Sequence, residues 1–209
     1  WREIVDQLIA QQSFEDQGVY FQVTRGVAKR DHAFPAGVEP TVFVMSNPLV
    51  NPARELVENG GAAVTAVDNR WLRCDIKSIS LLGNCMLRQL SADAGATETI
   101  MFRDGKLSEA SASNVFIVAK GVIVGPPKSN LILPGITYDV VREIAQLLHT
   151  PLELREVMEA EVRSADEVWV TSSSKEVLAI VTLDGKPVGN GKPGPLFRRM
   201  HQSYQDFKR

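Results

Sequence analysis

The alternation of hydrophobic and polar residues divides the chain into short strands and a few helices. Apolar residues recur at helical spacing from Ile4 to Ile9 and predict a helix at the start of the chain. The β-branched and aromatic residues at 19–24 predict a strand, and a second strand is expected near 41–45. This first part of the chain is therefore expected to form one helix followed by two strands.

The pattern breaks at residues 46–52. This stretch shows no periodicity and contains two Asn-Pro steps, which favour a turn or loop over regular structure. We therefore predict a domain boundary here, with residues 1–50 in a smaller domain and residues 53–209 in a larger one.

The larger predicted domain mixes hairpins with helices. Strands are expected at 62–67 and in three hairpins, at 98–108, 114–124 and 180–188. The turn of the first hairpin, Asp104-Gly105, is a typical type I′ signal. Helices are expected at about 82–95, 138–149 and 196–208. Because strands and helices do not alternate regularly, the sequence predicts an α+β fold and not a doubly wound sheet.

Composition narrows the class of protein. Of the 209 residues, 44% are hydrophobic and 23% are charged, as in an ordinary globular protein. The 23 Lys and Arg nearly balance the 25 Asp and Glu, and a net charge of −2 argues against nucleic acid binding. No apolar run approaches the roughly 20 residues that a membrane helix needs. Two cysteines are too few for a disulfide framework and lack zinc-ligand spacing. We expect a reduced, cytoplasmic setting without membrane, nucleic acid or metal partners.

Two segments carry residues that could react with or bind a ligand. Lys77 lies in an apolar-rich stretch, where a partly buried amine could form an imine; a solvated strand residue is the plainer interpretation. Further along, residues 131–137 lead into a helix, with Thr137 expected as its N-cap and Gly135 allowing close approach of a ligand. This helix start could bind an anion or be an ordinary capped helix.

Three more segments are equally ambiguous when taken singly. A strand within 168–174 ends in hydroxyl residues that could bind phosphate or form a polar turn. Glu109 precedes small residues that would let a flat ligand approach, although turns look similar. Arg25, Arg30 and His32 lie in one loop that could bind a carboxylate or form a salt-bridge network. Together, an amine, a phosphate site, a carboxylate and an anion site are what pyridoxal phosphate chemistry requires.

With these segments combined, the sequence resembles the class IV pyridoxal-phosphate aminotransferases, whose fold is shared with aminodeoxychorismate lyase. The most specific motifs are WLRCDIK at 71–77, EASASNVF at 109–116 and ILPGIT at 132–137. Residues 20–26 and 30–35 are similar to the branch of the family that acts on D-amino acids. The resemblance implies fold type IV, with part of a small α/β domain and a larger cofactor-binding domain of mixed strands and helices.

The resemblance also implies roles for single residues. Lys77 would form an imine with pyridoxal 5′-phosphate and then move a proton between the substrate Cα and the cofactor. Glu109 would keep the pyridine nitrogen protonated, and Leu133 would pack against the ring. The phosphate would be bound by Ile136, Thr137, Ser172 and Ser173.

The activity implied by the resemblance is transfer of the amino group of D-alanine to 2-oxoglutarate, giving pyruvate and D-glutamate. Arg30 and His32 would reach across a homodimer to hold the substrate α-carboxylate, which would decide which hydrogen faces Lys77. Two alternatives stay open: a branched-chain or (R)-amine transaminase of the same fold, and a cofactor-binding fragment without turnover.

The chain departs from the family pattern in several places. Ala110 replaces a Gly and Ala112 a hydroxyl residue, so one small polar contact is expected to be absent. Tyr138 replaces a frequent basic residue, and Ser173 replaces a Thr while keeping the hydroxyl. A family segment that carries an Arg to the phosphate and a Tyr to the substrate has no match here. We therefore expect that the front of the small domain is missing.

Overall fold

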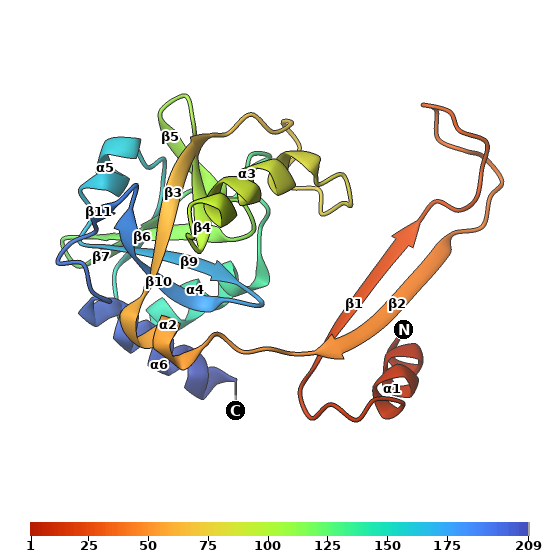
Figure 1. Cartoon of the computed structure of the whole chain (residues 1–209), viewed down its shortest axis with the longest axis horizontal. Coiled ribbons are helices and arrows are strands. Elements are labelled where there is room, and N and C mark those ends of the chain that lie inside the picture. Colours follow the sequence, from red (N-terminus) through yellow and green to blue (C-terminus); the bar gives the residue numbers. More distant parts are fainter. Residues whose placement is uncertain (209) are drawn as a thin grey trace. The chain divides into compact units, whose positions relative to one another are not determined.

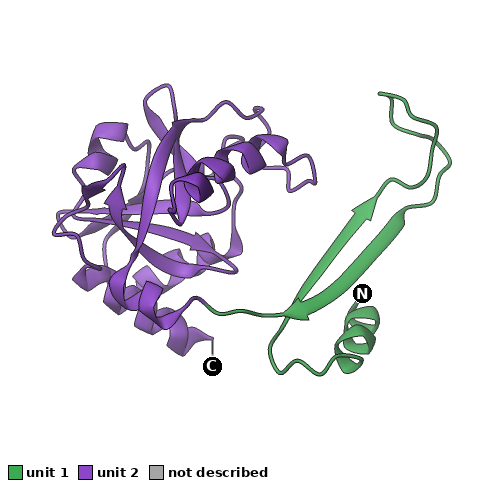
Figure 2. Cartoon of the chain, viewed as in Figure 1, with its two compact units in different colours: residues 1–51 green, residues 52–209 purple. Residues whose placement is uncertain are grey.

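The computed structural model describes residues 1–208 and divides the chain into two compact units. Unit 1 comprises Trp1–Asn51, and unit 2 begins at Pro52 (Figure 2). The change from one unit to the other falls at the second Asn-Pro step of the sequence, where proline restricts the residue before it to extended conformations.

Unit 1 is a helix followed by a two-stranded antiparallel hairpin. Its elements are α1 (Arg2–Ala10), β1 (Gln17–Thr24) and β2 (Thr41–Pro48). The two strands pair in one continuous register, from Gln17 opposite Pro48 to Thr24 opposite Thr41. The helix and the two strands expected in this part of the chain are therefore confirmed.

Unit 2 is built on one nine-stranded mixed sheet (Figure 1). The strands are β3 (Gly61–Val67), β4 (Glu98–Arg103), β5 (Lys106–Ala110), β6 (Asn114–Ala119), β7 (Val122–Gly125), β8 (Leu152–Leu154), β9 (Glu167–Ser172), β10 (Glu176–Leu183) and β11 (Lys186–Pro187). Their order is β5-β4-β3-β10-β9-β6-β7-β8, and β11 pairs with β10. β3 is parallel to β4 and β10, and β7 is parallel to β8, whereas the other pairs are antiparallel.

Helices cover this sheet. They are α2 (Arg54–Asn59), α3 (Leu82–Asp93), α4 (Ile136–Leu147), α5 (Glu159–Arg163) and α6 (Pro195–Phe207). α4 and α6 pack against each other and against β9 and β10, respectively, whereas α3 packs on β3 and β4 (Figure 1). No helix formed by residues 1–208 is both long and apolar enough to span a membrane.

The central strands are buried on both faces, and the hydrophobic core therefore has two parts. Val115 and Ile117 of β6 belong to one part, and Phe116 and Val118 belong to the other, as alternation along a strand requires. The second part also holds the fully buried Trp169 and is closed by α4 and α6. Strands covered on both faces need continuous apolar runs, which explains why period-two alternation is weak in this part of the sequence.

Two-residue turns connect the two strands of three antiparallel hairpins. The turns are Asp104-Gly105, Lys120-Gly121 and Asp184-Gly185, and both residues of each turn have positive φ. Positive φ at both central positions defines the type I′ turn, whose twist matches that of the flanking strands. The predicted type I′ turn at Asp104-Gly105 is confirmed, and the turns of the other two predicted hairpins have the same conformation.

The sequence did not predict the short elements α2, β8 and α5. They contain 6, 3 and 5 residues, which is too few to show a helical or strand period. The expected helix at 138–149 begins and ends about two residues earlier, as α4.

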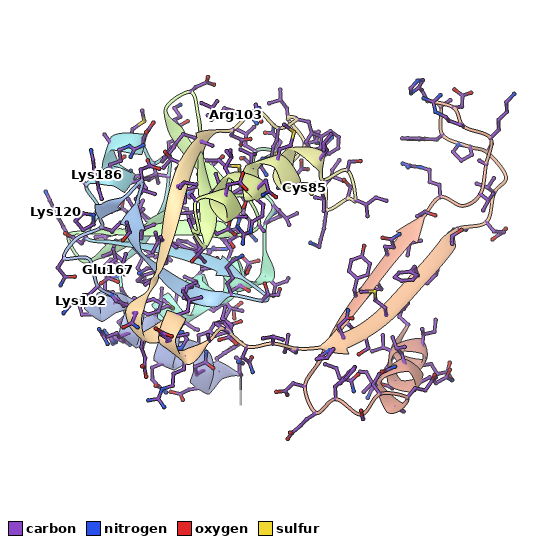
Figure 3. The ribbon with its side chains drawn as sticks, viewed as in Figure 1. Cys85, Arg103, Lys120, Glu167, Lys186 and Lys192 are labelled. Atoms are coloured by element: carbon purple, nitrogen blue, oxygen red, sulfur yellow. The ribbon has the colours of Figure 1, made fainter. Side chains whose placement is uncertain are left out.

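A buried carboxylate fixes the N-terminus of α6. Glu167 of β9 (Figure 3) accepts hydrogen bonds from the backbone N–H groups of Leu196 at 3.0 Å and Phe197 at 2.8 Å. It also accepts one from the indole N–H of Trp169 at 2.9 Å. Because the first N–H groups of a helix lack partners within the helix, this carboxylate both satisfies them and interacts favourably with the helix dipole.

We predict that Glu167→Ala lowers the free energy of unfolding by about 2–4 kcal/mol, because buried N–H groups lose a charged acceptor. Urea denaturation followed by circular dichroism measures the change. Glu156→Ala is the matched control, since Glu156 is exposed and its ion pair with Lys106 is expected to contribute less than about 1 kcal/mol. Equal losses in the two variants would contradict a special role for Glu167.

Candidate functional site

The residues that the sequence singles out lie in loops and at the ends of strands and helices. In unit 2, Lys77 lies in the loop between β3 and α3, Glu109 near the end of β5, and Leu133 in the loop before α4. The candidate phosphate ligands lie at the start of α4 and at the end of β9. Arg30 and His32 lie in unit 1, in the loop that joins β1 to β2.

Glu109 is held by donors from three other segments. Its Oε1 accepts a hydrogen bond from the Arg70 guanidinium at 2.7 Å. Its Oε2 accepts hydrogen bonds from the Leu133 backbone N–H at 2.9 Å and from the Asn114 amide at 3.1 Å. The same amide donates to the Leu133 carbonyl at 2.8 Å. The carboxylate thus joins the loop after β3, the start of β6 and the loop before α4.

A second carboxylate, Asp68, binds the other side of the Arg70 guanidinium. Arg70 donates to both carboxylate oxygens of Asp68, at 2.9 and 3.0 Å, and Arg103 lies 3.0 Å from the same carboxylate. Burial alone would raise the pKa of Asp68, but hydrogen bonds from Arg70 and Ser108 outweigh it and hold this pKa well below its usual range. Asp68 is therefore charged at neutral pH, and Arg70 is shared between two carboxylates.

Burial raises the pKa of Glu109 to about 7. The hydrogen bond and charge of Arg70 and the N–H of Leu133 offset this effect only in part, and the negative charge of Asp68 adds to it. A positively charged N–H group placed against Glu109 would lower this pKa and keep the carboxylate ionised. Glu109 is therefore suited to bind a protonated ring nitrogen.

The loop that carries Lys77 is fixed on the N-terminal side of this residue. The Cys74 N–H donates to the Asn130 carbonyl at 2.8 Å, and the Asn130 amide donates to the Leu72 carbonyl at 2.8 Å. Lys77 is exposed and forms no hydrogen bond or ion pair with any described residue. Lys77 therefore takes an exposed position and not the partly buried one considered from the sequence.

The start of α4 offers N–H groups without partners among residues 1–208. Gly135 is the N-cap, in an extended conformation, and no side chain caps the helix, so the prediction that Thr137 is the N-cap is wrong. Gly135 takes this position because it packs against Asn114: an added Cβ would lie 2.6 Å from the Asn114 Oδ1. Thr137 is the second helical residue, and its buried side chain makes no hydrogen bond within residues 1–208. The first N–H groups of a helix are suited to bind an anion.

The end of β9 adds hydroxyl groups near the same place. Thr171 pairs with Asn114 across the sheet, so the two side chains lie on one face. The Thr171 hydroxyl is buried and has no hydrogen-bond partner among the described residues. The Ser172 hydroxyl accepts a hydrogen bond from the Lys175 N–H at 3.0 Å, whereas Ser173 is exposed. The unpaired Thr171 hydroxyl and the open N–H groups of α4 are suited to bind an anionic group, whereas the Ser172 hydroxyl belongs to a closed polar turn.

In unit 1, the three cationic candidates of the loop between β1 and β2 have different surroundings. The Arg25 guanidinium stacks on the Phe34 ring, 3.7 Å from the ring centroid, and stabilises the loop. The Asp31 carboxylate accepts a hydrogen bond from the His32 backbone N–H at 2.6 Å. The side chains of Arg30 and His32 are exposed and form no ion pair with the part of the chain that the structure describes. These two residues are therefore available to a ligand.

The sequence did not single out four charged residues of this region: Asp68, Arg70, Glu98 and Lys175. Glu98 carried a signal, because a carboxylate at the start of an otherwise apolar strand requires a buried partner. The pair of Arg70 and Glu109 carried none, since the two residues are 39 apart in the sequence. Within residues 1–208, no group of three or more His, Cys, Asp or Glu side chains could hold a metal ion.

Comparison with known proteins finds relatives over most of the chain. The family model described as amino-transferase class IV matches residues 1–183. A D-alanine aminotransferase from Bacillus licheniformis is 41% identical over 191 residues, which cover 91% of this chain and 67% of the relative.

Solved structures share the fold. A branched-chain amino acid aminotransferase from Thermoproteus uzoniensis, solved with norvaline, has a TM-score of 0.83 and 26% identity, covering 98% of this chain and 68% of its own. A T.th. branched-chain amino acid aminotransferase with pyridoxamine 5′-phosphate has a TM-score of 0.89 and 23% identity, covering 98% of this chain and 69% of its own. The predicted fold type IV architecture is confirmed.

We predict that Glu109 makes the protein less stable as the pH rises, when no ligand is bound. The unfolded chain loses this proton near pH 4.3, whereas the folded protein keeps it until about pH 7. The folded state therefore binds more protons between these values, and its free energy of unfolding falls by up to about 4 kcal/mol.

Urea denaturation at a series of pH values from 4.5 to 8 measures this effect. Glu109→Gln removes the titrating group and should show a shallower decline than the unchanged protein, while the histidines contribute equally to both. The lowered pKa of Asp68 makes the free energy of unfolding fall as the pH falls, but this change lies below about pH 4.5. Identical pH profiles for the two proteins would contradict the prediction.

Proposed function

The chain belongs to the class IV aminotransferases and is a pyridoxal-phosphate-dependent transaminase, and we propose that it transfers the amino group of D-amino acids to 2-oxo acids. The proposed donor is D-alanine and the proposed acceptor is 2-oxoglutarate, giving pyruvate and D-glutamate. The observation that carries the proposal is the similarity to the D-alanine aminotransferase of Bacillus licheniformis, which extends over most of the chain.

Lys77 is the proposed catalytic residue. Bound pyridoxal phosphate supplies an electron-withdrawing ring, which stabilises the negative charge left when the substrate Cα loses its proton. The Nζ of Lys77 holds the cofactor and, once released, accepts that proton. The anchored segment that precedes it supports this role.

Glu109 and Leu133 form the proposed ring site. The carboxylate of Glu109 binds the protonated ring nitrogen, and the opposite charges stabilise each other in a buried place. Arg70 keeps the carboxylate oriented through its hydrogen bond to Oε1. Leu133, whose backbone N–H also holds Glu109, packs its half-buried side chain against the ring.

The proposed phosphate site combines α4 with the end of β9. Its ligands are the N–H groups of Ile136 and Thr137 and the hydroxyls of Thr137, Ser172 and Ser173. The absence of a side-chain cap on α4 supports the site, because its N–H groups stay available. The unpaired buried hydroxyl of Thr171 supports it as well, since it marks a polar region that the described residues do not satisfy.

Arg30 and His32 are the proposed ligands of the substrate α-carboxylate. In the proposed homodimer, they bind the substrate that occupies the site of the other subunit. A guanidinium suits a carboxylate because it can donate two parallel hydrogen bonds. Arg25 does not take this role, since it stacks on Phe34. A carboxylate held on one side fixes which hydrogen of the substrate Cα faces Lys77, which gives selectivity for one enantiomer.

A second candidate function is a branched-chain transaminase that acts on L-amino acids. It is favoured by the likeness to the Thermoproteus uzoniensis enzyme, which extends over nearly the whole chain. The two functions differ in the enantiomer of the donor and in the size of its side chain, so a single half-reaction separates them.

We predict that D-alanine, but neither L-alanine nor L-leucine, bleaches the visible absorbance of the cofactor bound to this protein. Lys77→Ala should abolish both this absorbance and the half-reaction, because the amine that holds the cofactor is gone. Stopped-flow absorbance spectroscopy measures both. Lys192→Ala is the control, since Lys192 is exposed and its side chain forms no described contact (Figure 3). Bleaching by L-leucine with D-alanine inert would support the branched-chain function instead.

We predict that Arg30→Ala weakens the binding of D-amino and 2-oxo acids by about 2–5 kcal/mol, the size expected when a buried partner of a carboxylate is removed. The concentration dependence of the two half-reactions measures this loss. Lys29→Ala is the matched control from the same loop and should bind substrates as before. If Arg30→Ala lowers only the melting temperature, the loop is structural.

A further inference from the structure

Another buried carboxylate lies beside the proposed site, at the start of β4. Glu98 has no exposed surface and receives hydrogen bonds from the hydroxyls of Ser111 at 2.5 Å and Ser113 at 2.7 Å. The Nζ of Lys175 lies 3.0 Å from its Oε1. We call these residues the Glu98 cluster, and none of them has a role in the function proposed above.

The Glu98 cluster needs the cation that Lys175 supplies. Burial alone would raise the pKa of Glu98, but the charge of Lys175 and the hydrogen bonds from Ser111 and Ser113 outweigh it and lower this pKa. Glu98 is therefore charged at neutral pH. A buried charge without a partner is strongly unfavourable, so loss of Lys175 would force Glu98 to take up a proton or move.

On its serine side, the cluster fixes the segment that links Glu109 to Asn114. Ser111 and Ser113 lie within this segment, and both donate to Glu98. The Ser111 carbonyl also accepts a hydrogen bond from the Asn84 amide of α3 at 2.9 Å. The segment therefore cannot shift without breaking hydrogen bonds to a buried carboxylate.

On its lysine side, the cluster fixes the turn at 173–175 between β9 and β10. The Lys175 N–H closes this turn by donating to the Ser172 hydroxyl at 3.0 Å. The next residue, Glu176, has a φ of 56°, which a residue other than glycine adopts only when its surroundings impose it. Glu176 is itself held by an ion pair with Lys208. Both sides of the turn are thus anchored by charge.

We propose that Lys175 is a positioning residue for the phosphate of the cofactor. Its ion pair with Glu98 fixes the turn at 173–175 relative to the segment that carries Glu109. The inference rests on the proposed function, which takes Ser173 as a phosphate ligand and Glu109 as the ligand of the ring nitrogen. The ring nitrogen and the phosphate of the cofactor are then bound by two different segments, and the ion pair of Glu98 and Lys175 holds these segments together.

Direct binding of phosphate by Lys175 is the competing explanation. The contacts of the ammonium group argue against it, because they are to Glu98 and, at 3.5 Å, to Ser113, and only 21% of the side chain is exposed. The two explanations predict opposite results for Glu98→Gln. A direct ligand would be released to bind phosphate more tightly, whereas a positioning residue would lose its anchor.

The test compares dissociation constants for pyridoxal phosphate and for pyridoxal, which lacks the phosphate, by titrating the cofactor-free protein. Lys175→Met should weaken pyridoxal phosphate binding about ten- to hundredfold, as when a hydrogen bond to a charged group is lost. Pyridoxal binding should stay nearly unchanged, because Glu98 can take up a proton and still accept the hydrogen bonds of Ser111 and Ser113. Glu98→Gln should also weaken pyridoxal phosphate binding, and Lys175→Arg should keep most of it. The double variant should lose no more than either single variant.

Two further variants serve as controls. Lys186→Met changes an exposed lysine of β11 (Figure 3) that forms no ion pair among the described residues, and it should bind both ligands like the unchanged protein. Ser173→Ala separates this inference from the proposed function. If Ser173→Ala leaves pyridoxal phosphate binding unchanged, the proposed phosphate site itself is wrong.

Three results would overturn the role of Lys175. The first is unchanged pyridoxal phosphate affinity in Lys175→Met while Ser173→Ala weakens it. The second is an equal loss for both ligands, which would indicate a general structural role. The third is tighter pyridoxal phosphate binding by Glu98→Gln, which would indicate a direct ligand. If circular dichroism shows that Lys175→Met does not fold, Glu98→Gln and Lys175→Arg decide the same question.

Discussion

The burial of charge is the constraint on which the candidate site depends. The carboxylates of Asp68, Glu98 and Glu109 belong to residues that are 4%, 0% and 5% exposed. Arg70 forms ion pairs with the first and last of these, and Lys175 forms one with the other. An unpaired buried charge is very unfavourable. The Arg70–Glu109 and Lys175–Glu98 pairs form only when β3, β4, β5, β9 and β10 have their observed order, whereas Asp68 and Arg70 are two residues apart. The site is therefore a product of the sheet and not of any single loop.

Local structure could be predicted where the signal is local. The pair Asp104-Gly105 determines its own turn, because few residues other than Gly, Asn and Asp tolerate positive φ at both positions. Apolar periodicity likewise predicts α4 and α6, since each buries one face against the sheet. The resemblance to a family was carried by such local motifs, which is why the fold type could be predicted from the sequence.

The partners of the buried carboxylates could not be predicted in this way. Arg70 and Glu109 are 39 residues apart, and Glu98 and Lys175 are 77 apart, so only the strand order brings them together. The wrong N-cap has the same origin. Thr is an ordinary capping residue, but the close approach of Asn114 requires a glycine at the cap, and this contact overrides the local preference.

Tyr138, which stands where the family often has a basic residue, has a structural role in unit 2. Its side chain is fully buried, stacks on Phe116 with ring centroids 4.8 Å apart, and donates to the Pro126 carbonyl at 2.8 Å. It therefore stabilises the core beneath α4 and does not face an anion. The proposed phosphate ligands of unit 2 are all uncharged, and the charge of Lys175 is balanced by Glu98. Among these groups, the positive potential for the proposed phosphate therefore comes from the N-terminus of α4, where no side chain caps the first N–H groups.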